Sequence, residues 1–82
     1  MSPRQLRVAL EVLQPEDLPE RFDLRDGLSV TDRRQFVDGL RVSADVGAAG
    51  WRPDLEAALG HLNDPKDFGR RYDAAGGTRP PQ

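Results

Sequence analysis

The sequence predicts an all-α protein: a compact bundle of three to four short helices with one long proline-containing connection. Two patterns predict this fold class. Acid or hydroxyl residues followed by proline recur as helix starts, most clearly at Asp64-Pro65-Lys66-Asp67. Leu, Ala and Phe recur at the i, i+3, i+4, i+7 spacing of one helical face. A third observation bounds the size: 82 residues without cysteine make one small domain with a net stability of roughly 3–5 kcal/mol.

The first helix is expected to begin at Ser2-Pro3, where Gln5 completes a capping box. Its apolar positions share one helical face: Leu6, Ala9, Leu10 and Leu13. The same stretch also alternates as a strand would, through Leu6, Val8, Leu10 and Val12. The cap favours the helix, and an α+β fold with residues 6–13 as a strand is the alternative.

Pro15 and Pro19 then interrupt helical geometry, so residues 14–30 are predicted to be a long connection. One helical turn around 16–21 fits within it. Four apolar residues are candidate anchors to the core: Phe22, Leu24, Leu28 and Val30. Asp26-Gly27 is typical of a tight turn, and a short hairpin around it is an alternative to an irregular loop.

The second helix is expected to begin near Thr31-Asp32, with Ser29 or Thr31 as the cap and Asp32 complementing the helix dipole. Its apolar stripe is Phe36, Val37, Leu40 and Ala44. Gly39 costs about 1 kcal/mol inside a helix, which favours a close approach of another backbone there. The helix must end before Gly47.

The third helix is expected to begin around Arg52-Pro53-Asp54, with Gly60 inside it. Its stripe is Leu55, Ala58, Leu59 and Leu62. The fourth begins at Asp64-Pro65 and ends at Gly76-Gly77, with Phe68, Tyr72 and Ala75 on one face. We therefore expect a single domain over residues 1–75 and a flexible tail over residues 76–82.

The charge balance disfavours nucleic acid as the partner. The net charge is −2 and the isoelectric point is near 5.2, whereas phosphate binding needs a basic surface. Eleven of the twelve basic residues are arginine, which a GC-rich genome explains better than a recognition surface does. Without a signal peptide or a membrane-spanning stretch, the sequence favours a cytoplasmic protein.

No catalytic, cofactor or metal motif is present in the sequence. His61 is the only histidine, and no cysteine or second histidine could complete a zinc site with it. No serine lies in a nucleophile elbow, and Gly47-Ala48-Ala49-Gly50 lacks the Lys-Ser/Thr ending of a phosphate loop. An enzyme that assembles scattered Asp and Arg residues around His61 is therefore the least favoured hypothesis.

The favoured hypothesis is a small non-enzymatic protein–protein interaction module. It would act as an accessory subunit, regulator or inhibitor of a larger protein, or within a bacterial or phage assembly. A second copy of the chain is a further candidate partner. The candidate partner-binding residues are Phe22, Trp51, Arg52, Arg70, Arg71 and Tyr72. For Trp51 the sequence favours a buried role at the helix entrance over an exposed anchor.

The alternative is a DNA-binding regulator of helix-turn-helix type. The tight corner at Asn63-Asp64-Pro65 would make the 65–75 helix the reading element. Its phosphate contacts would come from Lys66, Arg70, Arg71 and Arg79.

Overall fold

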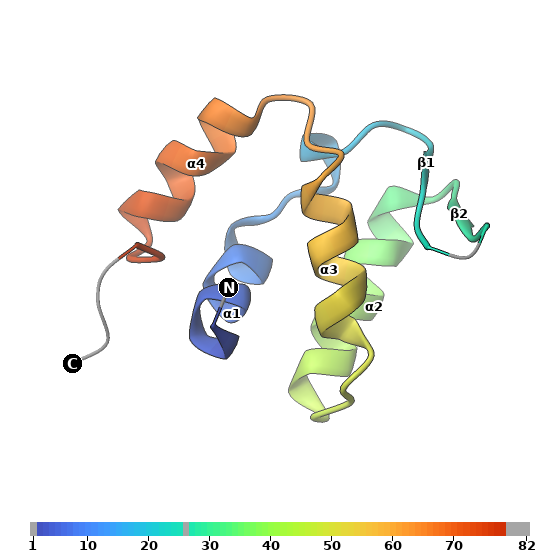
Figure 1. Ribbon diagram of the computed structural model, residues 1–82, viewed down its shortest axis with the longest axis horizontal. Helices are drawn as coiled ribbons and strands as arrows, with labels where there is room; N and C mark the ends of the chain where they lie inside the picture. Colours follow the sequence, from blue (N-terminus) through green and yellow to red (C-terminus); the bar gives the residue numbers. More distant parts are fainter. Residues whose placement is uncertain (1, 26, 79–82) are drawn as a thin grey trace.

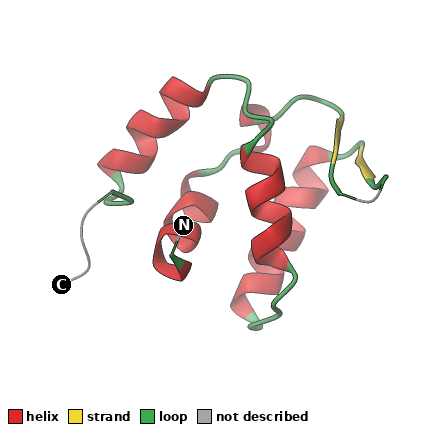
Figure 2. Ribbon diagram, in the orientation of Figure 1, coloured by secondary structure: helices red, strands yellow, loops and turns green. Residues whose placement is uncertain are grey.

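The computed structural model describes residues 2–25 and 27–78, and this part of the chain is mostly helical (Figures 1 and 2). It contains four α-helices: α1 (Pro3–Val12), α2 (Arg33–Asp45), α3 (Trp51–Leu59) and α4 (Pro65–Ala74). Between α1 and α2 the chain forms shorter elements: a 3-10 turn, η1 (Pro15–Asp17), and two strands, β1 (Phe22–Asp23) and β2 (Ser29–Val30).

Helix α1 occupies the centre of the arrangement. It packs against α2, α3 and α4, and α2 packs along α3. Figure 1 shows α4 on one side of α1 and the α2–α3 pair on the other, with the β1–β2 hairpin at the end of the molecule remote from α4. Because α4 makes its main contact with α1, the corner between α3 and α4 does not form the close helix pair that the DNA-binding hypothesis uses.

The helical prediction for residues 6–13 is confirmed, and the strand alternative is wrong. Ser2 Oγ accepts from the Gln5 N–H at 3.2 Å, and the Ser2 N–H donates to Gln5 Oε1 at 2.9 Å, which completes the capping box. The four apolar positions of the helical face are all buried: Leu6, Ala9, Leu10 and Leu13. A strand would have placed Val8 and Val12 on that face instead, and both are only partly buried.

The first short element after α1 begins earlier than expected. The helical turn predicted around 16–21 is instead η1, because Pro15 occupies its first position and Asp17 caps it by accepting from the Gln14 N–H at 2.8 Å. Leu18 follows directly and is fully buried. The connection is therefore tied to the core in its first half.

The second half of the connection is the short hairpin. Strands β1 and β2 are antiparallel, with Phe22 opposite Val30 and Asp23 opposite Ser29. The Ser29 hydroxyl donates to Asp23 Oδ1 at 2.6 Å. The expected anchors Phe22 and Val30 are buried, but Leu28 is 64% exposed, so that anchor was wrongly predicted. Asp26, half of the predicted turn, lies outside the described residues.

The cap of α2 differs from the expectation. Asp32 itself is the cap and accepts from the Gln35 N–H at 3.1 Å, because the helix begins at Arg33; Ser29 lies four residues earlier and donates to Asp23 in the hairpin. Gly47 ends the helix with a φ of +77°. No other backbone approaches Gly39 closely, since an added Cβ there would meet no atom within 4 Å.

Helix α3 is shorter than predicted, whereas α4 begins where the sequence placed it. Gly60 caps α3 rather than lying inside it, so Leu62 falls outside the helix. Asp64 caps α4 as expected and accepts from the Asp67 N–H at 3.1 Å. Ala75 is the C-cap, and the buried Gly76 and Gly77 follow it, with their N–H groups donating to the Asp73 and Tyr72 carbonyl oxygens. Arg79–Gln82, from the predicted tail, lie outside the described residues.

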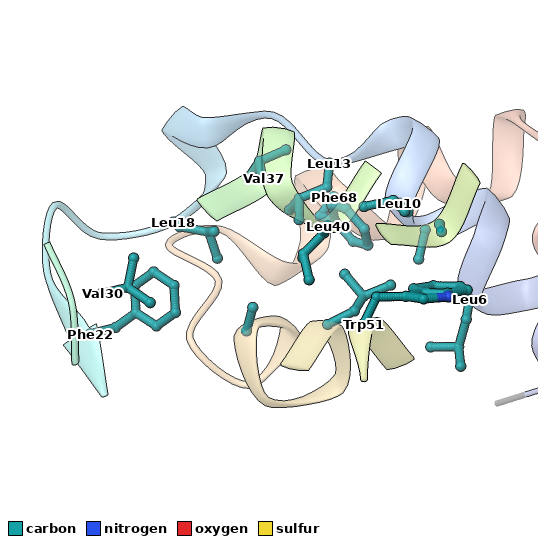
Figure 3. Packing of buried hydrophobic residues seen from close by; sticks show 14 residues of the cluster. Leu6, Leu10, Leu13, Leu18, Phe22, Val30, Val37, Leu40, Trp51 and Phe68 are labelled. Atoms are coloured by element: carbon teal, nitrogen blue, oxygen red, sulfur yellow. The ribbon is translucent and has the colours of Figure 1, made fainter. Parts of the chain in front are cut away.

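The core runs the length of the molecule. In Figure 3, Phe22 and Val30 lie at one end, Leu13 and Phe68 near the middle, and Trp51 beside Leu6 at the other. All fourteen buried core side chains are hydrophobic, and within the described residues no polar or charged side chain is buried among them. Within residues 2–25 and 27–78, the large hydrophobic side chains that remain exposed are Leu28, Val42 and Val46.

Candidate functional site

The structure places two of the six predicted partner-binding residues in the core. Phe22 is buried beneath the hairpin, where its ring meets Phe36 edge-on at 5.4 Å and His61 at 5.3 Å. Trp51 is also buried, as the preferred interpretation of the sequence expected. It lies between two guanidinium groups, with Arg7 at 5.9 Å and Arg52 at 5.8 Å from its ring centroid. Both rings are thus used within the chain.

Arg71 is the centre of a polar contact between distant parts of the chain. Its guanidinium donates to Asp17 Oδ1 at 2.5 Å, to the Val12 carbonyl oxygen at 3.2 Å and to Asp67 Oδ2 at 3.2 Å. It also lies 5.7 Å from the centroid of Phe68. The hydrogen bond to Asp17 is the main reason why the pKa of Arg71 is raised. Arg71 therefore fastens α4 to η1 and to the end of α1.

Other arginines bind backbone carbonyl groups in the same way. Arg33 donates to Leu18, Arg41 to Leu13 at 2.7 Å, and Arg7 to Ala44 at 3.0 Å. These contacts join residues that are 15 to 37 positions apart in the sequence. Part of the arginine content therefore has a structural role. Neither of the explanations considered from the sequence, genome composition and a recognition surface, predicted this role.

Tyr72 is held by the C-terminal cap of α4. Its hydroxyl donates to the Gly77 carbonyl oxygen at 3.0 Å, and its ring stacks with that of Phe68 at 6.3 Å. An added Cβ at Gly77 would overlap the Tyr72 ring, so any larger residue there would have to displace the ring. Burial raises the pKa of Tyr72, because desolvation disfavours the phenolate.

Arg52 and Arg70 are the predicted partner residues that lie exposed on the surface. The Arg70 side chain is 72% exposed and pairs with Asp67 at 3.3 Å. With Arg71 engaged by Asp17, the exposed cations on the described part of α4 are Lys66 and Arg70. Arg79, the fourth residue of the DNA-binding hypothesis, lies outside the described residues.

The outward side of α2 carries a surface that the sequence reasoning missed. We call it the α2 outer face, and it comprises Arg34, Asp38, Gly39, Val42, Asp45 and Val46, all of them exposed. Val42 in the last turn of α2 is 62% exposed, and Val46, the C-cap residue four positions later, is 75% exposed. Both valines are out of phase with the buried stripe of Val37, Leu40 and Ala44. Their spacing from that stripe can be read from the sequence, and it could have indicated that they lie on the outward side of the helix.

The charges of this face lack ion-pair partners. Arg34 and Asp38 are four residues apart, and Arg41 and Asp45 repeat the spacing, which suits ion pairs along a helix. In the described part of the chain, however, the ion pairs within 4.0 Å involve Arg70 and Arg71 with Asp17 and Asp67, and none joins these α2 residues. The face thus combines two exposed valines with three exposed charged side chains, Arg34, Asp38 and Asp45, that make no ion pair within the described residues, while the half-buried Arg41 beside them donates to the Leu13 carbonyl oxygen.

Other surface features offer less for binding. A shallow groove of about 360 Å³ borders Gly39 and is lined by Gln35, Phe36 and Ser43 from α2 and by Trp51 and Asp54 from α3. Among the residues that the structure describes, no group of three or more His, Cys, Asp or Glu side chains could hold a metal ion. No helix in the described ranges is both long and apolar enough to span a membrane.

Comparison with protein-family models, with curated proteins and with solved structures yields no match for this chain.

Proposed function

We propose that this protein is a non-enzymatic protein–protein interaction module, acting as an accessory subunit or regulator, and that it binds its partner through the α2 outer face. One observation carries the proposal: Val42 on α2 and Val46 at its C-cap are exposed beside charges that have no ion-pair partner among the described residues. Exposed apolar side chains next to unpaired charges are a combination that a partner surface can complement.

The energetic argument concerns both parts of the face. Complete burial of a valine is favourable by roughly 1.5–3 kcal/mol, and most of that remains to be gained at side chains exposed this far. The charges determine which partner binds and in which register more than they increase the affinity. Two apolar positions one turn apart are typical of a helix that packs against another helix or lies in a groove.

The other predicted partner residues support this choice indirectly. Phe22, Trp51 and Arg71 are engaged in the chain's own packing and hydrogen bonding, so their use by a partner would require the fold to open. Arg52 and Arg70 stay accessible and are secondary contact candidates. A DNA partner is a less favoured alternative, because Asp67 pairs with Arg70 and Arg71 on the helix that would read the bases.

Site-specific photocrosslinking tests the proposal. A photoreactive amino acid would replace Val42 on the α2 outer face and, as the matched control, Lys66 on α4, which is also exposed. We expect a defined protein adduct in the native host from the Val42 position, absent from the Lys66 position and suppressed by excess unmodified protein. Equal crosslinking at both positions, or none at Val42, would contradict the proposal.

A further inference from the structure

We infer that the α2 outer face binds a second copy of this chain, with the two α2 helices antiparallel around a two-fold axis. The inference rests on the proposed function, namely that this face binds protein, and it specifies the partner. The occupant follows from the charges along α2, from the polarity of the helix and from the shape of the face near its midpoint.

The charges along one flank of α2 alternate in sign. In chain order they are Arg34, Asp38, Arg41 and Asp45. Arg34 and Asp45 lie equally far on either side of the point between Gly39 and Leu40, and so do Asp38 and Arg41. Eleven residues are close to three helical turns, so Arg34 and Asp45 project from nearly the same side of the helix.

Two copies of this charge pattern place opposite charges together when the two helices run antiparallel. In an antiparallel pair, Arg34 faces Asp45 of the second copy and Asp38 faces Arg41 of the second copy, and the two-fold axis repeats both pairs. A parallel pair in the same register would instead place like charges together. Arg41 already donates to the Leu13 carbonyl oxygen, but its guanidinium has further N–H groups for a carboxylate.

The polarity of α2 favours the same arrangement. Arg34 lies in the first turn and Asp45 in the last, and although Asp32 caps the start of the helix, there is neither an acid in the first turn nor a base in the last. Each charge therefore opposes the dipole of its own helix. An antiparallel copy brings Asp45 to the positive end of the neighbouring helix and Arg34 to its negative end, which relieves both conflicts.

The shape of the face allows a close approach near the axis. Gly39 lies beside the midpoint, and nothing within 4 Å occupies the place of its missing Cβ. Val42 lies on the same face and is 62% exposed, so it can pack on the second helix. A helix of 13 residues is about 20 Å long and offers less area than the roughly 800 Å² per partner of stable complexes. The dimer should therefore be weak and sensitive to salt.

Sedimentation velocity of the purified full chain, from micromolar to millimolar concentration at low and high salt, tests the inference. We expect a monomer–dimer equilibrium that salt weakens. The single variants R34D and D45R each place like charges across the axis, so each should dimerise at least about tenfold more weakly. An equimolar mixture of the two variants restores opposite charges at both pairs, and we expect it to form a heterodimer. Circular dichroism confirms that each variant folds.

Three outcomes would overturn the inference. The wild-type chain could remain monomeric throughout, R34D could dimerise as well as the wild type, or the mixture could fail to associate more strongly than either variant alone. A monomeric wild-type chain that still crosslinks a different protein from the Val42 position would leave the proposed function standing and remove only the second copy. A dimer without crosslinking at Val42 would contradict both.

Discussion

Replacing Arg71 with methionine tests whether α4 is held to the rest of the fold by the contact with Asp17. Methionine keeps an unbranched stem of similar reach against Phe68 but removes the guanidinium. The variant therefore loses the hydrogen bonds to Asp17 Oδ1 and to the Val12 carbonyl oxygen, at 2.5 and 3.2 Å. The Asp17 carboxylate would keep the hydrogen bond from the Gln14 N–H.

The expected loss follows from the exposure of the two groups. The Asp17 side chain is only 16% exposed, whereas Arg71 is 35% exposed and so partly screened by solvent. A hydrogen bond to a charged group contributes about 1.5–3 kcal/mol, and this screening reduces the expected loss to about 1–2 kcal/mol. For a domain of this size such a loss lowers Tm by roughly 5–15 °C.

Thermal and urea unfolding followed by circular dichroism measure this loss. The matched control is Arg70→Met, the adjacent arginine, which pairs with Asp67 at 3.3 Å but is 72% exposed. We expect the control to lose less than about 0.5 kcal/mol. Equal losses in the two variants would refute the reasoning. The double variant Arg71→Met/Asp17→Asn gives a second test. If its loss of unfolding free energy equals the sum of the losses of the two single variants, the reasoning is refuted, because the effects of residues in direct contact are not additive.

Three further predictions concern the core, the glycines and the tyrosine. Leu55→Ala, at a fully buried site, should lose about 2–5 kcal/mol and leave little folded protein, whereas Leu28→Ala at the exposed hairpin should change stability by less than about 0.5 kcal/mol in urea titrations. Gly69→Ala places its methyl group in open space inside α4, so its free energy of unfolding should rise by up to about 1 kcal/mol. Gly77→Ala must displace the Tyr72 ring, so its free energy of unfolding should fall by about 1–3 kcal/mol. A higher Tm for Gly77→Ala than for Gly69→Ala would disprove this. The ultraviolet absorbance of Tyr72, the chain's one tyrosine, should titrate with a midpoint above pH 10, because burial raises its pKa. The raised pKa belongs to the folded state, so its contribution to stability is present below pH 10 and is lost as the pH rises through the folded pKa; a midpoint at or below 10 would contradict the burial.

The sequence predicted those parts of the fold that depend on neighbouring residues. The capping box at Ser2, the acidic cap at Asp64 and the glycine end of α4 each satisfy backbone groups within one turn, so short patterns suffice to find them. The boundary errors have the same origin. Ser29 and Thr31 were the predicted caps of α2, but the helix begins at Arg33, so Asp32 takes the cap position, and Ser29 belongs to the hairpin instead.

The long-range contacts could not be predicted from local patterns. Arg71 and Asp17 are 54 residues apart, and nothing in their neighbourhoods singles out either one. The α2 outer face is an intermediate case. The phase of Val42 and Val46 on the helix was visible in the sequence, but the absence of ion pairs beside them required coordinates.

The arginine-to-carbonyl contacts have a consequence for how this protein can change during evolution. Their acceptors at Val12, Leu13 and Leu18 belong to the main chain, so no substitution at those positions can remove the acceptor atom itself. Only the donor side of each contact is open to loss by a single codon change. Stretches that receive such bonds can therefore diverge in side-chain chemistry while the path of the chain through them is retained.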